Sequence, residues 1–140
     1  MRIRFAVLAA ALFALPAFAA DPPQPGMWKV TVRSETNGAV TAERSDDRCL
    51  TADALKSIEK SFAPEQGANC KRLSYEWTGQ RLSWRIACTV PIAMDNSGWY
   101  AFDNPQHYTG EIVVKMIIPG GVDMLSHTRL EGQRIGDCPH

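Results

Sequence analysis

The stretch CKRLSYEWTGQRLSWRIAC (residues 70–88) carries the strongest structural signal in the chain, because apolar and polar side chains alternate on both sides of a short turn. Alternation with a period of two is typical of half-buried β-strands. Pairing the two halves around Gly79-Gln80 matches apolar partners on one face: Tyr75 with Trp84, Leu73 with Ile86, and Trp77 with Leu82. The stretch therefore predicts an antiparallel hairpin with one buried face.

A second hairpin is expected upstream. Residues 27–34 alternate with Trp28, Val30 and Val32 on one face, which predicts a half-buried strand. Asn37-Gly38 follows, and this dipeptide is a strong hairpin signal because both turn positions take a positive φ. The return segment, residues 39–48, is much more polar and predicts a solvated or edge strand.

A third hairpin is expected near the C-terminus, where residues 108–118 and 122–134 flank Pro119-Gly120-Gly121. Pairing about Gly120 sets Met116 opposite Met124 and Ile118 opposite Val122. Residues 91–105, rich in Gly, Asn and Asp, predict an irregular loop. The expected fold is mainly β (α+β): a single curved antiparallel sheet or partial barrel of about six strands with one short helix, stapled by disulfides.

One short packing helix is expected after the second hairpin. Thr51 can cap its N-terminus, and Asp53 is favourable in the first turn. An apolar stripe at helical spacing follows, formed by Leu55, Ile58 and Phe62, and Pro64 and Gly67 end the helix.

Four cysteines, Cys49, Cys70, Cys88 and Cys138, predict two disulfides in an exported chain. A zinc site including His140 is the alternative, but no CxxC pair supports it, and we expect no metal and no cofactor. In an up-and-down sheet all four would lie at the same end, so topology forbids none of the three pairings. We favour Cys70–Cys88 with Cys49–Cys138, although Cys70 and Cys88 come out one residue out of register; Cys49–Cys70 with Cys88–Cys138 is the runner-up.

The N-terminus predicts export. Arg2 and Arg4 precede an apolar run, and Ala17-Phe18-Ala19 places small residues at the −3 and −1 positions of a cleavage site after Ala19. The apolar run is too short to span a bilayer, and no second run of that length follows. We expect a signal peptide (1–19), a stiff Pro-rich leader (20–26) that spaces the domain from the cut, and one β-rich domain (27–140) in the periplasm.

The composition excludes one class of partner. The full chain has 15 Lys+Arg and 15 Asp+Glu, and loss of Arg2 and Arg4 leaves a formal charge near −2. A nucleic-acid-binding surface calls for a basic stripe, which this sequence lacks. We expect a monomer without nucleic acid.

Five ordered motifs carry a family resemblance: PGMWKV (25–30), CLT (49–51), NCK (69–71) followed by Trp84 and Cys88, YTG (108–110), and RIGDC (134–138). Together they resemble the exported bacterial family named domain of unknown function 3617. The resemblance covers nearly the whole chain after residue 19 and implies periplasmic export, a Gram-negative source and a cysteine-stapled β domain. It implies no activity and transfers no site residues. The segment around Trp99 and the Pro139-His140 tail depart from it.

Sequence features favour a binding module over an enzyme. His127 follows Ser126, but strand neighbours point to opposite faces and cannot form a nucleophile–base pair. Asp103 and His107 are interpreted as solvated loop residues.

Three loop aromatics, Trp99, Tyr100 and Phe102, are expected to cover the open sheet; contact with a small apolar molecule or lipid is the alternative that makes them candidate binding residues. A structural or protein-interaction module of the cell envelope, using the edge strand 39–48, is the competing hypothesis.

Overall fold

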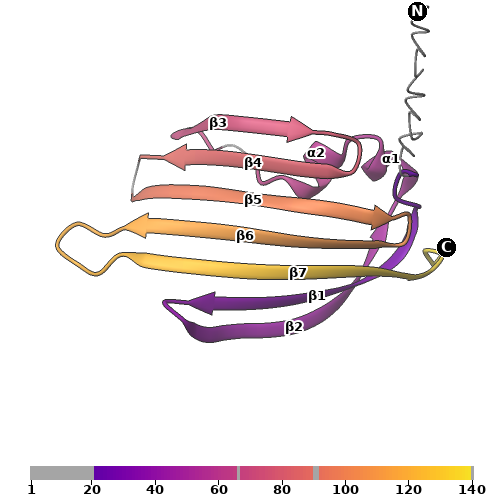
Figure 1. The fold of residues 1–140 in the computed structure, drawn as a ribbon, viewed down its shortest axis with the longest axis horizontal. Coiled ribbons are helices and arrows are strands. Elements are labelled where there is room, and N and C mark those ends of the chain that lie inside the picture. Colours follow the sequence, from indigo (N-terminus) through magenta and orange to yellow (C-terminus); the bar gives the residue numbers. More distant parts are fainter. Residues whose placement is uncertain (1–20, 66, 90–91, 140) are drawn as a thin grey trace, which may run out of the picture.

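The computed structural model describes residues 21–65, 67–89 and 92–139, so the predicted signal peptide (1–19) and His140 lie outside the described residues. Figure 1 shows one open sheet with two short helices behind it. The elements, in chain order, are β1 (Gly26–Thr36), β2 (Ala39–Leu50), α1 (Ala52–Leu55), α2 (Ile58–Phe62), β3 (Cys70–Trp77), β4 (Arg81–Cys88), β5 (Ala93–Asn104), β6 (His107–Ile117) and β7 (Met124–Gly136).

The sheet is antiparallel throughout, with seven strands in the order β2-β1-β7-β6-β5-β4-β3. The mainly β prediction is confirmed, but the expected number of strands was one short. The additional strand is β5, which occupies most of the segment expected to be an irregular loop. It pairs along its length with β4 on one side and β6 on the other. Ladders on both sides thus hold a segment with weak local strand propensity.

The first and last strands in the sequence are neighbours in the sheet. β1 pairs with β7 along its length, from Met27 opposite Gly136 to Thr36 opposite Ser126. The Asn37-Gly38 turn has the predicted positive φ at both residues, 48° and 83°. Asn37 also extends the ladder, since its backbone N–H donates to the Leu125 carbonyl (2.8 Å) and its Oδ1 accepts from the Leu125 N–H (2.9 Å). As predicted, β2 is an edge strand.

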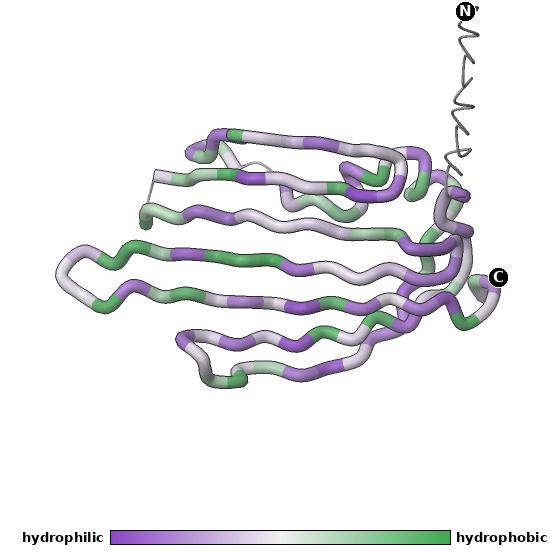
Figure 2. Tube along the Cα trace, in the orientation of Figure 1, coloured by the Kyte–Doolittle hydropathy of each residue, from purple (hydrophilic) through white to green (hydrophobic). Residues whose placement is uncertain are grey.

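The core lies on the face covered by the helices, which we call the inner face. Alternation places Trp28, Val30 and Val32 of β1 there, as predicted, each at most 6 % exposed. The remaining buried apolar side chains are Ile58, Leu82, Trp84, Ile86, Cys88, Tyr100, Phe102 and Tyr108. Figure 2 shows the longest hydrophobic stretch of the tube along the middle of β6, between strands of mixed polarity.

The predicted single helix is broken into two. Thr51 caps the first as expected, with its Oγ1 accepting from the Ala54 N–H at 3.1 Å. Ser57 then takes φ −132° and ψ 72°, outside the helical region, and the chain restarts as α2. Ile58 and Phe62, four residues apart on α2, both pack onto the sheet.

The segment between β2 and β3 crosses the inner face, joining strands at opposite edges of the sheet. We call the end where β1 begins and β7 ends the termini end, and the opposite one the hairpin end. Registers place the C-terminus of β2 at the termini end but the N-terminus of β3 at the hairpin end. The expectation that all four cysteines share one end is therefore wrong.

Both favoured disulfides are present. Cys49–Cys138 joins β2 to the segment after β7 at the termini end, and Cys70–Cys88 joins β3 to β4 at the hairpin end. Since the two pairs lie at opposite ends of strands eight or more residues long, the runner-up pairing is sterically impossible.

The predicted hairpin of residues 70–88 forms with one correction. Tyr75 pairs with Trp84 and Trp77 with Leu82, but Arg72, not Leu73, lies opposite Ile86. Leu73 is the extra residue of a β-bulge and is 48 % exposed. The bulge shifts the register by one and brings Cys70 directly opposite Cys88.

Two smaller expectations also change. Met116 pairs with Met124 as predicted, but Ile118 and Val122 lie beyond the paired strands. The Pro-rich leader is not a free spacer in residues 21–25, because Pro23 is buried and the Gln24 N–H donates to the Pro105 carbonyl at 2.8 Å.

Candidate ligand-binding cavity

Three aromatic rings on the inner face lie across glycines of the next strand: Trp84 over Gly98, Tyr100 over Gly110, and Tyr108 over Gly132. A Cβ at Gly132 would lie 2.1 Å from Cε1 of Tyr108, and one at Gly110 would lie 2.5 Å from Cδ1 of Tyr100. Each ring therefore depends on a missing side chain opposite it. Each ring leans over the neighbouring strand that is nearer to β2, so all three point away from β4 and toward the β2 edge of the sheet.

Phe62 of α2 closes this aromatic layer from above. Its ring meets those of Tyr100, Phe102 and Tyr108 edge to face, with centroids 5.1 to 5.3 Å apart. Trp28 packs on the far side of Tyr108 at 5.5 Å. Edge-to-face contacts of this kind add to the stabilisation that burial gives. The layer is thus a rigid support rather than a mobile cover.

A cavity of about 290 Å³ lies on the inner face beside this layer. Its lining joins apolar side chains from four strands and α2 to a polar rim on β1, β2 and β7; the residues are Val30, Val32, Ser34, Arg44, Arg48, Leu50, Ser61, Phe62, Tyr100, Tyr108, Ile112, Thr128 and Leu130. Two larger hollows near the helices are more open to solvent. The cavity is partly open and is lined by both apolar and polar groups, a combination that can hold and orient a small molecule.

Two phenol hydroxyls at this cavity lack protein partners. Tyr100 and Tyr108 are only 6 % and 4 % exposed, yet neither hydroxyl forms a hydrogen bond within the described part of the chain. Burial raises the pKa of both phenols, and the nearby positive charge of Arg48 lowers both pKa values in part. Arg48 of the edge strand therefore lies close to both tyrosines.

The positive and negative charges along the inner side of β2 do not cancel. Arg44, Asp46 and Arg48 alternate onto the inner face, opposite the buried side chains of β1. Arg44 Nε pairs with Asp46 Oδ2 at 3.0 Å. Arg48 forms no ion pair with any residue that the structure describes. The rim of the cavity thus carries one unbalanced positive charge.

The three predicted binding residues do not act together. Tyr100 and Phe102 are core residues of β5 rather than loop residues, and of the three only Tyr100 lines the inner cavity. Trp99 points to the outer face, where the Arg81 guanidinium lies 4.1 Å from its ring centroid.

Sequence reasoning missed Tyr108 and Arg48 as lining residues. Gly110 and Gly132, isolated within strand patterns, are the signal that could have located the close ring contacts.

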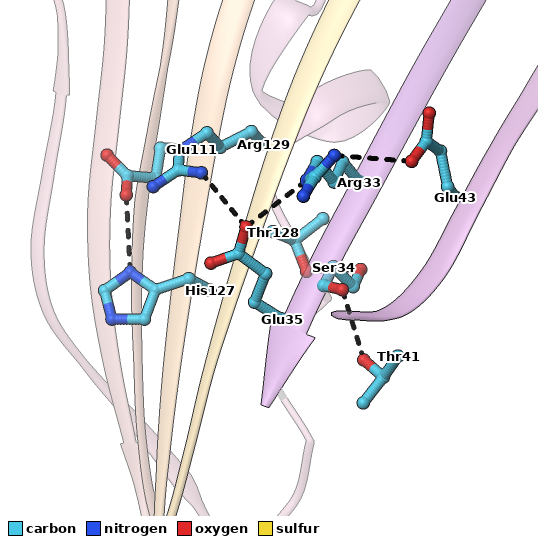
Figure 3. Close-up of polar contacts among 9 residues, drawn as sticks. All are labelled: Arg33, Ser34, Glu35, Thr41, Glu43, Glu111, His127, Thr128 and Arg129. Atoms are coloured by element: carbon cyan, nitrogen blue, oxygen red, sulfur yellow. Dashed lines mark hydrogen bonds and ion pairs between the residues drawn. The ribbon is translucent and has the colours of Figure 1, made fainter. Parts of the chain in front are cut away.

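The outer face is a network of exposed ion pairs (Figure 3). The Glu35 carboxylate lies between Arg33 (3.3 Å) and Arg129 (3.4 Å), and Arg33 also reaches Glu43 at 3.4 Å. Networks of this exposure contribute little to stability and mainly keep the face solvated.

The histidines offer no assembled nucleophilic site. Strand alternation places Ser126 on the inner face and His127 on the outer face, where His127 Nδ1 lies 3.4 Å from Glu111. His107 lies between two carboxylates, with Nδ1 2.6 Å from Asp103 and Nε2 3.1 Å from Glu131. Partial burial lowers the pKa of His107, but these two carboxylates raise it by more, so its net pKa is raised.

Within residues 21–65, 67–89 and 92–139, no three His, Cys, Asp or Glu side chains gather as a metal site would require. The helices described there are also too short to cross a bilayer.

Comparison with known proteins places the chain in a family without a known activity. No curated protein and no solved structure matches it. One family, described as "Protein of unknown function (DUF3617)", matches residues 23–138. That span contains the entire sheet, both helices and all four cysteines. The protein therefore belongs to the family of proteins of unknown function DUF3617.

Proposed function

We propose that the protein is a non-enzymatic binding module that holds a small apolar molecule or lipid on the inner face of its sheet. The observation that supports this most is the partly enclosed cavity beside α2, floored by apolar side chains and by two tyrosines whose hydroxyls have no hydrogen-bond partner among the described residues. Its volume of about 290 Å³ is at the lower end for ligand pockets, which suits a small molecule or one end of a longer one.

The test is a titration with N-phenyl-1-naphthylamine, a neutral apolar probe whose fluorescence rises when it leaves water. Leu130 lines the cavity, so Leu130→Trp should fill the space and abolish probe binding. Leu125→Trp is the matched control, because Leu125 lies on the same strand but points to the outer face, where it is 41 % exposed.

Wild type and Leu125→Trp should bind the probe equally. Absence of binding to the wild type, or unchanged binding to a folded Leu130→Trp variant with both disulfides, would contradict the proposal.

We also infer that the protein is exported to the periplasm with cleavage after Ala19. The apolar N-terminus with its small-residue cleavage pattern and the two disulfides support this. The intact mass of the protein from a periplasmic extract should equal that of residues 20–140 less four hydrogens. A mass that includes residues 1–19 would contradict the inference.

A structural or protein-interaction module of the envelope is the second candidate. One observation favours it: apolar side chains are exposed at the hairpin end, with Ile117 49 % and Val122 79 % exposed. If this function holds, serine at both positions should abolish association with an envelope protein while leaving probe binding intact.

A further inference from the structure

The unbalanced charge at the cavity rim has a consequence for ligand choice. Because Arg44 is neutralised by Asp46, Arg48 is the one cation of this rim without an ion-pair partner among the described residues. Arg48 is exposed, so water solvates its charge and a neutral ligand gains nothing from it, whereas a cationic ligand would be repelled. One negative charge on the ligand would balance the rim.

The two buried phenols point to the same chemistry. A phenol hydroxyl and a guanidinium N–H both donate, and Tyr100, Tyr108 and Arg48 line the same cavity, so all three call for an acceptor on the ligand. An anionic oxygen is the strongest such acceptor, since charge-assisted hydrogen bonds are shorter and stronger than neutral ones. Both hydroxyl oxygens stay accessible from the cavity, since among the described residues only the Tyr75 hydroxyl is a fully buried side-chain polar atom without a partner, and the ligand gives them an acceptor that the protein itself does not supply.

The rest of the cavity selects an apolar group. Val30, Val32, Ile112 and Leu130 form a continuous wall next to the polar corner. This wall lets an alkyl chain leave water, which is favourable, but it gives a bare anion no favourable contact.

We infer that the cavity takes an amphipathic monoanion, an alkyl chain that ends in a carboxylate or comparable singly charged group, with the anionic oxygens at Arg48, Tyr100 and Tyr108. This inference rests on the proposed binding function and specifies its ligand class.

The experiment measures displacement of bound N-phenyl-1-naphthylamine at neutral pH by four competitors: decanoate, 1-decanol, decyltrimethylammonium and acetate. Wild type should bind decanoate at least about tenfold more tightly than decanol, which corresponds to about 1.4 kcal/mol. Decyltrimethylammonium should bind more weakly than decanol, and acetate should not displace the probe.

The variants separate charge from fold. Arg48→Gln should weaken decanoate binding about tenfold and should weaken decanol and probe binding by much less, and Arg48→Lys should retain most of the decanoate preference. Tyr108→Phe removes one donor and keeps the ring, so it should weaken decanoate binding more than decanol binding. Lys29→Gln is the charge-matched control, because Lys29 is exposed on the outer face of β1.

The outcomes distinguish the two proposals. If wild type binds neither the probe nor any competitor, the proposed function fails. If the probe and decanol bind but decanoate binds no better, or Arg48→Gln and Lys29→Gln weaken decanoate equally, only the monoanion inference is overturned. Displacement by acetate alone would replace it with a simple anion site.

Discussion

Gly132 of β7 supports the cavity by having no side chain. The Tyr108 ring occupies the space where a Cβ would lie, 2.1 Å from Cε1. We expect Gly132→Ala to displace this ring and lower the free energy of unfolding by about 1–3 kcal/mol, the usual cost of overpacking. Urea denaturation followed by fluorescence measures the change.

Gly136→Ala is the matched control on the same strand, since a Cβ there meets nothing within 4 Å. It should change stability by less than about 0.5 kcal/mol. Equal losses in both variants would mean that strand propensity, and not the ring contact, explains the effect.

His107 adds a pH-dependent contribution. Its pKa is raised in the folded state because hydrogen bonds from its ring to Asp103 and Glu131 outweigh its partial desolvation. A raised folded-state pKa stabilises the protein fully below the unfolded value of about 6.5, and this stabilisation is lost as the pH rises through the folded-state pKa.

His107→Gln should therefore destabilise the protein more at about pH 5 than at about pH 8.5. The difference between the two pH values should be less than roughly 1 kcal/mol, since both carboxylate partners of His107 are exposed. Unfolding free energies of both proteins at the two pH values measure this. In an Asp103→Asn background the pH-dependent difference should shrink; an unchanged difference would assign it to another group.

At the scale of single elements, the bulge at Leu73 determines the register of the β3–β4 hairpin. It leaves Leu73 48 % exposed, while Leu82 on β4 is fully buried. Leu73→Ala should cost less than about 0.5 kcal/mol, whereas Leu82→Ala should cost about 2–5 kcal/mol because it leaves a cavity. Denaturant midpoints of the two variants compare them directly. A large loss of stability for Leu73→Ala would contradict the bulge and would indicate the regular register, in which Leu73 lies opposite Ile86.

Two elements show where local sequence patterns mislead. The β5 segment contains Asp95-Asn96-Ser97-Gly98, which locally resembles a loop, yet its backbone pairs on both sides and Asp95 forms an ion pair with Arg85 of β4. The expected helix breaks at Ser57, whose backbone leaves the helical region, although Leu55, Ile58 and Phe62 all contact the core as the apolar stripe predicts. For β5, pairing on both sides outweighs local propensity.

For the whole molecule, the two disulfides close loops of very different length. Cys49–Cys138 spans 89 residues and Cys70–Cys88 spans 18. In the chain-entropy description, removal of the long link should cost about 4.5 kcal/mol and removal of the short link about 3 kcal/mol. Urea denaturation of the two double Cys→Ala variants tests this order. A larger loss for the Cys70–Cys88 variant would show that native contacts of the hairpin, and not loop closure, dominate.

The candidate site was only partly accessible from the sequence. Tyr100 was singled out as an aromatic residue, but in an expected loop and grouped with Trp99, which faces the other side of the sheet. Tyr108 and Arg48 come together only because β6 and the edge strand β2 both contribute to one face beneath α2. Nothing in the positions of Tyr108 and Arg48 along the sequence indicates that the two residues line the same cavity.

The amino-acid sequence by itself determined the three hairpins, the edge strand and the family. These depend on alternation, turn chemistry and short motifs, all of which act between residues close in the chain. For the disulfides the sequence favoured the observed pairing but left the runner-up open, because Cys49 and Cys138 are 89 residues apart. The tertiary structure alone decided that β5 is a strand, that the segment between β2 and β3 crosses the inner face, and that a cavity opens beside Phe62. The β5 strand depends on pairing with β4 and β6 on both sides, which its own residue pattern does not reveal. The crossing segment and the cavity depend on packing between residues far apart in the chain, whose free energy exists only once the sheet has assembled.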